Sequence, residues 1–140
     1  MCSSDLSIGA RFYAAFENIT LSNAAAYGII NYDILNQSIL LFAYPASSSW
    51  TLNFRGSVTT SLNSIMNIGD SVGAVFMTQQ GVTAFYNTSI TIDGTANYVY
   101  WQGGTAPTNG NTSSIDTYAY TIIKTASSTY TVLASQTQFK

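Results

Sequence analysis

Few side chains in this sequence could carry out chemistry. The chain has six carboxylates, no histidine and a single cysteine, Cys2. Without histidine it lacks the usual general base near neutral pH and the commonest zinc ligand. One cysteine excludes an intrachain disulfide. No GxxxxGK phosphate loop or DxDxDG calcium loop is present. We therefore expect no enzymatic activity, no cofactor and no metal.

The carboxylates are scattered singly along the chain, mostly next to turns. Asp33, Asp70, Asp93 and Asp116 stand where Asp commonly binds nearby backbone amides, so turn stabilisation is the favoured interpretation. A calcium or sugar contact is one alternative. Catalysis by two aspartates, such as Asp93 with Asp116, is the other, because a carboxylate pair can hydrolyse glycosides.

Aromatic residues make up 14% of the chain and offer flat surfaces on which sugar rings can stack. Trp50 begins an alternating apolar segment, which favours a place in the core. Trp101 ends an aromatic segment just before the polar loop 102–114, so it is either a ligand contact or an anchor for the loop. The candidate ligand-binding residues are Tyr100, Trp101, Gly103, Gly104 and Asp116.

These residues must be positioned by strands. Short segments alternate between apolar and polar residues, and Asp93-Gly94 has the residue types of a two-residue hairpin turn. Frequent strands without long helices predict an all-β fold, an antiparallel β-sandwich resembling a jelly roll, with eight or nine strands. One short helix is expected near 60–68. The expected strands are 16–21, 27–33, 38–44, 50–55, 70–80, 82–92, 98–101, 115–124 and 129–135.

Composition limits the partners of the chain. Charged residues are only 7% of the 140 residues, and the net charge is −2. The four basic residues are isolated from one another, so we expect no nucleic-acid binding. The longest apolar run is far below the roughly 20 residues that span a bilayer, so no membrane insertion is expected. A surface poor in charge suits packing against other chains, or a monomeric protein of low charge.

The length suits one domain, expected at residues 12–140. Residues 1–11 have no periodicity and are expected to be a disordered or artefactual tail. Residues 2–6 (CSSDL) resemble one reading frame of a sequencing adapter, and a native N-terminus is the alternative.

Several segments together resemble C-terminal modules of virion structural and tail-fibre proteins of marine tailed bacteriophages, especially those that infect cyanobacteria. The resemblance covers residues 19–139. It rests on WTLNFRG (50–56), QG (80–81), IDG (92–94), WQGGTAP (101–107), IDTY (115–118), IIKT (122–125) and VLASQT (132–137).

The resemblance implies a location in the virion after folding in the host cytoplasm, and a non-enzymatic role in assembly and host-surface attachment. It implies a homo-oligomer, such as a trimer, or contact with other virion proteins, and a cell-surface glycan as a ligand. It carries no catalytic residue. The alternative function is a carbohydrate-binding module of an exported bacterial protein.

Overall fold

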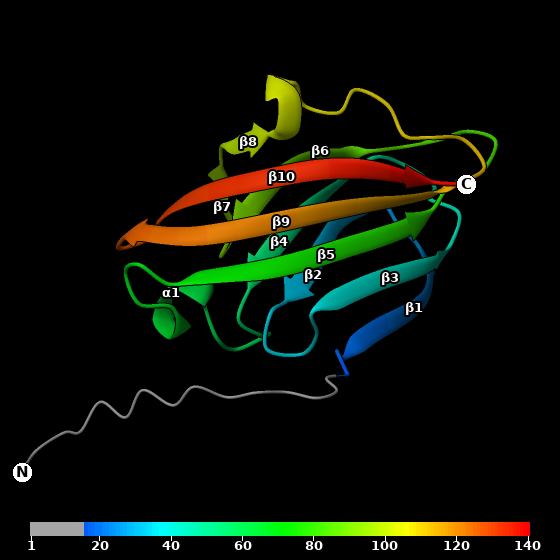
Figure 1. Ribbon diagram of the computed structural model, residues 1–140. Coiled ribbons are helices and arrows are strands. Elements are labelled where there is room, and N and C mark those ends of the chain that lie inside the picture. Colours follow the sequence, from blue (N-terminus) through cyan, green and yellow to red (C-terminus); the bar gives the residue numbers. More distant parts are fainter. Residues whose placement is uncertain (1–15) are drawn as a thin grey trace, which may run out of the picture.

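The computed structural model describes residues 16–140, which form two β-sheets packed face to face (Figure 1). The expected tail at residues 1–11 lies outside the described residues. The elements are β1 (Ile19–Ala25), β2 (Gly28–Asp33), β3 (Ile39–Tyr44), β4 (Trp50–Arg55), α1 (Leu62–Ile65), β5 (Ser71–Gln79), β6 (Asn87–Ile92), β7 (Thr95–Asn97), β8 (Val99–Trp101), the 3-10 turn η1 (Gln102–Gly104), β9 (Ile115–Ala126) and β10 (Thr129–Phe139).

The all-β sandwich is confirmed, but its sheets are mixed and not antiparallel. One sheet has the strand order β1-β3-β5-β9-β10-β8 and the other has the order β2-β4-β6-β7. Within the described residues there are ten strands, where eight or nine were expected. Five of the strand pairs are parallel and three are antiparallel. A jelly-roll arrangement is not established.

Four of the five parallel pairs arise because the chain alternates between the two layers from β1 to β6. Each strand therefore lies beside the strand two places earlier, and both run the same way. Alternation of side chains along a strand reports which face is buried and carries no information on the direction of its neighbour. This is why the sequence pattern led to an antiparallel sandwich.

Aromatic side chains fill the space between the sheets. Trp50 is 1% exposed, which confirms its place in the core. Its indole packs edge-on against Tyr118, with ring centres 5.7 Å apart, and in a tilted arrangement against Phe76 at 5.4 Å. Phe54 packs against Tyr120 at 5.0 Å. Since these pairs join the two sheets, the aromatic contacts hold the sandwich together.

Several boundaries differ from the sequence prediction. The first strand, expected at 16–21, begins at Ile19 and continues to Ala25. Residues 82–86 are not a strand, so β6 begins only at Asn87. The last strand, expected at 129–135, continues to Phe139, which is 57% exposed.

The expected helix is a single turn, and charged groups contact both of its ends. Asp93 lies in the expected β6–β7 turn, where Asp93 and Gly94 adopt φ values of 50° and 81°. Its carboxylate accepts hydrogen bonds from the backbone amides of Leu62 and Asn63. At the other end the ammonium of Lys124 donates to the carbonyl oxygens of Asn63 and Met66, each at 2.7 Å. A negative group at the N-terminus and a positive group at the C-terminus both stabilise a helix.

The buried hydroxyl of Tyr120 gives a first testable expectation. It has no hydrogen-bond partner, and burial raises its pKa well above the ordinary 10.0. Tyr120→Phe should therefore raise the free energy of unfolding by about 0.5–1.5 kcal/mol. In the wild type the hydroxyl is neutral below pH 10 in both the folded and the unfolded chain. Above pH 10 it ionises only in the unfolded chain, so the free energy of unfolding falls. Between pH 9 and pH 11, the free energy of unfolding of the variant, measured by urea titration, should fall by about 1 kcal/mol less than that of the wild type.

Tyr118→Phe is the matched control for Tyr120→Phe. The Tyr118 hydroxyl accepts hydrogen bonds from the side-chain amide of Gln136 at 2.9 Å and from the backbone amide of Asn87. Its removal should lower the free energy of unfolding by about 1 kcal/mol. Equal effects of the two substitutions would contradict the assignment of an unpartnered hydroxyl to Tyr120.

Candidate functional site

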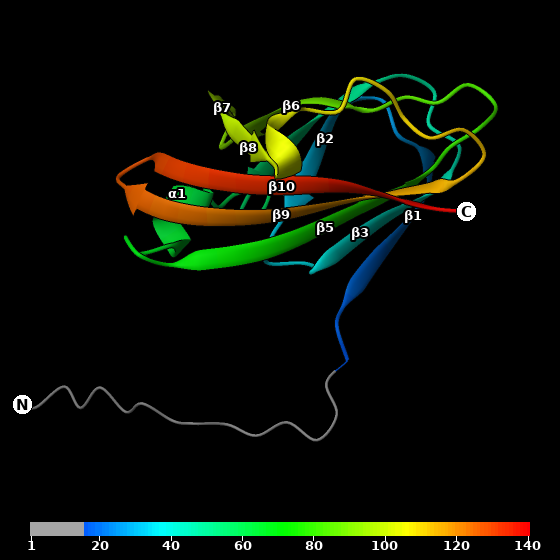
Figure 2. The ribbon, with the colours of Figure 1, turned by 45° about the horizontal axis from the view of Figure 1, so that its top comes forward.

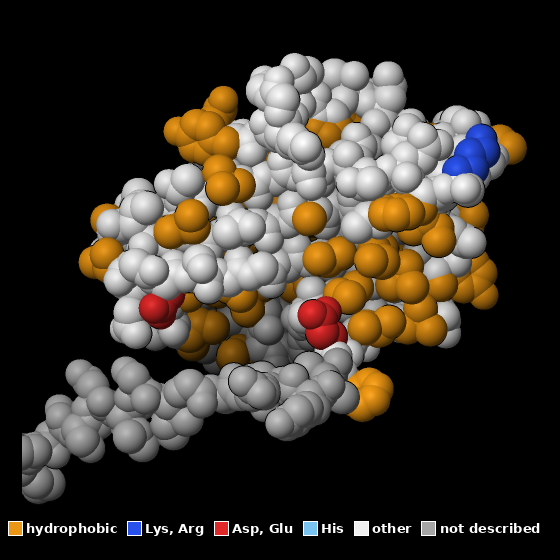
Figure 3. Space-filling view, in the orientation of Figure 1, with side chains coloured by type: hydrophobic (Ala, Val, Ile, Leu, Met, Phe, Trp, Pro, Cys, Tyr) orange, Lys and Arg blue, Asp and Glu red, His pale blue; other side chains and the backbone are white. Residues whose placement is uncertain are grey.

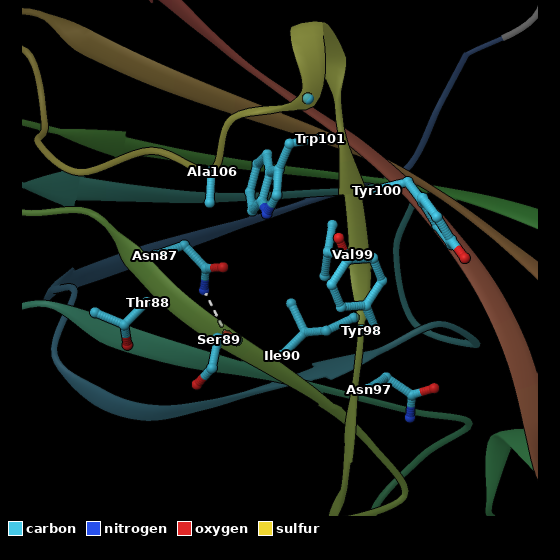
Figure 4. Close-up of a pocket in the computed structure, with 11 residues that line it drawn as sticks. Asn87, Thr88, Ser89, Ile90, Asn97, Tyr98, Val99, Tyr100, Trp101 and Ala106 are labelled. Atoms are coloured by element: carbon cyan, nitrogen blue, oxygen red, sulfur yellow. Dashed lines mark hydrogen bonds between the residues drawn. The ribbon is translucent and has the colours of Figure 1, made fainter.

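A hollow of about 440 Å³ opens between β6 and the segment from β7 to η1, at the edge where the two sheets meet (Figure 4). Residues of both polar and aromatic type surround it. They are Asn87, Thr88, Ser89, Ile90, Asn97, Tyr98, Val99, Tyr100, Trp101, Gly104 and Ala106. We call this hollow the β6–β8 pocket.

The pocket exists because the chain changes sheets between β7 and β8. β7 pairs with β6 in the four-stranded sheet, whereas β8 pairs with β10 at the edge of the six-stranded sheet. Figure 2 shows β8 and η1 beside β10, above the gap between the layers. Gly103 and Gly104, with φ of 74° and 76°, then turn the chain in a left-handed conformation that favours glycine.

Trp101 forms one wall of the pocket and also contacts the core. Its ring centre lies 6.5 Å from that of Tyr118 and 6.2 Å from that of Tyr120, both in edge-to-face geometry. The indole is half-buried and also lines the pocket. The two roles that the sequence left open for Trp101 are therefore compatible, since one side anchors β8 while another faces the hollow.

Asn87 lies at the base of the pocket and has an unpartnered acceptor. The residue is 2% exposed, and its side-chain amide nitrogen donates to the carbonyl oxygens of Ser89 at 2.9 Å and Trp50 at 3.3 Å. These two bonds fix the orientation of the amide. Its oxygen, Oδ1, accepts no hydrogen bond. Figure 4 shows this oxygen pointing away from Ser89, toward the side of the pocket where Trp101 lies. A buried acceptor without a donor costs about 1–3 kcal/mol, which marks a place where a small rearrangement and an added donor would be stabilising.

The structure brings three of the five predicted site residues to one pocket. Trp101, Tyr100 and Gly104 line it, although the ring of Tyr100 points away from the hollow in Figure 4. That ring packs edge-on against Tyr98 at 4.9 Å. Gly103 does not line the pocket and serves the turn of η1.

Asp116 lies in a different environment from the pocket and is completely buried. Its carboxylate accepts hydrogen bonds from the backbone and side-chain amides of Asn111 at 2.9 and 2.7 Å, and from the side-chain amide of Gln80 at 3.0 Å. A carboxylate with no exposed surface and three donors holds the 102–114 loop in place. The expectation that Asp116 contacts a ligand is therefore not supported by its position in this fold.

The polar residues of β6 were missed by sequence reasoning. Asn87, Thr88 and Ser89 lie inside the segment 82–92 that was expected to be one strand. They reach the pocket because β6 pairs with β4 through Asn87 and Ser89, while the later residues of β6 pair with β7. The one available signal was the polar interruption between the apolar residues of 82–85 and Ile90.

The pocket is electrically neutral, because no Asp, Glu, Lys or Arg lines it. The described carboxylates that make hydrogen bonds serve separate local structures. Asp33 pairs with Arg55 at 2.5 Å, Asp70 accepts from Asn67, and Asp93 contacts α1. Among residues 16–140 no three metal-ligating side chains lie close enough together to hold an ion. The pocket offers stacking surfaces and neutral hydrogen-bonding groups, and no acid–base pair lies in it.

No helix in the described part of the chain has the length and apolar character needed to cross a membrane. Comparisons with models of protein families, with curated proteins and with solved structures gave no match to this chain.

Proposed function

We propose that this chain is a non-enzymatic attachment module that binds a neutral saccharide in the β6–β8 pocket. The observation that carries the proposal is a hollow lined by the Trp101 indole together with the neutral polar groups of Asn87, Ser89 and Asn97. Sugar rings present apolar faces that stack on aromatic rings, and hydroxyls that pair with amides and hydroxyls. A site without charge suits a neutral sugar better than an acidic one, since a bound carboxylate would lose its hydration without gaining a cation.

The biological setting that we propose is the virion of a tailed bacteriophage. Its support is the resemblance of residues 19–139 to virion structural and tail-fibre modules, together with the low charge of the chain. In this setting the saccharide would belong to the host surface, and the domain would act in assembly and attachment. The second candidate is a carbohydrate-binding module of an exported bacterial protein. The same pocket would support it, and tail or secretion genes beside this one would distinguish the two.

Binding should be tested by titrating the isotope-labelled protein with neutral saccharides. Glucose, galactose, N-acetylglucosamine and cellobiose are suitable probes, with glucuronic acid as the charged comparison. We expect at least one neutral sugar to shift the amide resonances of Ser89, Asn97 and Trp101 with a millimolar dissociation constant. Shifts that lie only elsewhere, or a preference for glucuronic acid, would contradict the proposed site.

Two variants separate loss of binding from loss of stability. Trp101→Ala should weaken saccharide binding at least tenfold, but it also removes contacts with Tyr118 and Tyr120 and should lower the melting temperature. Ala106→Trp places a large ring at an exposed pocket residue and should abolish binding while the melting temperature changes by less than about 3 °C. Ala126→Trp, at the exposed β9–β10 turn, is the matched control and should bind normally. Normal binding by Ala106→Trp would exclude the pocket.

A further inference from the structure

The outer face of the six-stranded sheet carries rows of apolar side chains that face solvent. β1, β3, β5 and β9 lie in register, so equivalent residues stand side by side across the sheet. The intervening Leu40, Phe76 and Tyr118 are buried, so their neighbours along each strand point outward. The first row is Ile19, Ile39, Val75 and Ala119, and the second begins with Leu21, Leu41 and Met77. We call these seven residues the outer apolar face.

Figure 3 shows apolar side chains gathered over β1, β3 and β5 on this face. Ile19 is 49% exposed and Leu21 is 57% exposed, and both lie on β1, the edge strand of the sheet. β1 contains no charged residue and no proline, which are the usual means of discouraging association at an exposed edge. The face is therefore built without the features that keep sheets apart.

Among residues 16–140, no charged side chain lies on the outer apolar face itself. The strands β1, β3, β5, β8 and β10 contain none, and the two charges of β9, on Asp116 and Lys124, are buried on its inner side. At one end, the Glu17 carboxylate accepts a hydrogen bond from Ser38 beside the start of β3. At the opposite end, Lys140 follows β10 and borders the same shallow hollow as Gln79, the last residue of β5. Figure 3 shows acidic and basic side chains on opposite sides of the apolar cluster.

We propose that the outer apolar face binds the same face of a second copy of this chain, in a two-fold symmetric dimer. In a face-to-face dimer the two-fold axis lies in the plane of the interface. When this axis is perpendicular to the line from Glu17 to Lys140, the rotation exchanges the two ends of the face. Glu17 of each copy then meets Lys140 of the other, so the interface is self-complementary in charge as well as apolar. An axis parallel to that line would instead place the two Glu17 residues against each other.

The size of the face sets the strength of the dimer. Four strands about 4.8 Å apart carry two rows of side chains about 7 Å apart, so the seven residues cover roughly 250 Å² on each copy. Stable complexes bury about 800 Å² on each partner. The dimer should therefore be weak and reversible, with a dissociation constant between about 10 µM and 1 mM.

Sedimentation equilibrium of the full chain between 10 µM and 1 mM tests the proposal. Leu21→Lys should weaken the dimer at least tenfold, because the two-fold axis introduces the ammonium twice into the interface. Ile29→Lys is the matched control, since Ile29 is 74% exposed on β2 of the other sheet. It should leave the dimer unchanged. Circular dichroism and melting of both variants establish that each is folded.

A charge exchange tests the symmetry without touching an apolar residue. Glu17→Lys and Lys140→Glu should each weaken the dimer about 3- to 10-fold, and the double variant should restore it to within about twofold. A monomer at 1 mM would overturn the proposal, including the case in which residues 1–15 cover the face within one chain. The proposal would also be overturned by a trimer or by an association that Leu21→Lys does not affect. A double variant that dimerises as weakly as the single ones, or binding of neutral lipid vesicles in place of a second copy, would overturn it as well.

Discussion

Asp116→Ala is expected to lower the free energy of unfolding by about 3–4 kcal/mol, among the largest effects of any single substitution in this chain. The carboxylate is completely buried and accepts hydrogen bonds from three donors, two on Asn111 and one on Gln80. Its removal leaves these donors without an acceptor in a site that excludes water. Gln80 also binds the backbone of Phe85 through both ends of its amide, so the segment between β5 and β6 should loosen as well.

Urea unfolding followed by tryptophan fluorescence measures this effect, and Asp70→Ala is its control. Asp70 is exposed and accepts a single hydrogen bond from the backbone amide of Asn67, so its loss should cost less than about 1 kcal/mol. Asp116→Asn keeps the shape but replaces one acceptor with a donor, so it should fall between the two. A cost below 1 kcal/mol for Asp116→Ala would show that the 102–114 loop is held by other contacts.

Gly110→Ala is the second substitution with a large expected effect, of about 2–4 kcal/mol. A Cβ atom at residue 110 would lie 2.1 Å from the carbonyl oxygen of Phe85 and 2.9 Å from the side-chain nitrogen of Gln80. Both neighbours are fixed, because the Gln80 nitrogen donates to that same carbonyl oxygen at 2.6 Å. The methyl group can fit only if the backbone of the loop moves away.

Gly73→Ala controls for the general effect of replacing glycine. Gly73 lies in β5, and a Cβ there would meet no atom within 4 Å. This substitution should be neutral or slightly stabilising, because alanine restricts the unfolded chain. The difference in the midpoint of urea unfolding between the two variants reports the close approach at residue 110. Equal midpoints would mean that the loop can shift without cost.

The sequence was informative wherever local patterning decides structure. The alternation of 50–55 predicted β4 residue by residue, because every second side chain is buried. Asp93-Gly94 predicted the β6–β7 turn, because both residues tolerate positive φ. Segments whose structure depends on particular side-chain contacts, which the alternation of residue types does not report, were predicted poorly. Residues 82–86 are apolar enough for a strand, yet hydrogen bonds from Gln80 to Phe85 hold that segment as a loop.

The candidate site was only partly predictable for the same reason. Trp101 and Gly104 were found because an aromatic residue before a glycine-rich loop is visible in one short segment. Asn87 was not singled out, because its unpartnered oxygen arises from bonds to Ser89 and to Trp50, and Trp50 lies 37 residues away. Asp116 has a residue type that is common in ligand contacts. Its burial under the loop gives it a structural role instead, and no local sequence pattern reports that burial.

The position of β9 between β5 and β10 has a consequence for how the protein forms during synthesis. Each of the strands β3 to β6 pairs with a strand that precedes it in the chain, so β1 to β6 can assemble while the ribosome is still translating. The aromatic interior stays open at that stage, since Tyr118 and Tyr120 arrive with the last hairpin. β8 also waits, because its partner is β10. Completion of the fold is thus delayed to the final hairpin, and non-local closure of this kind is slow.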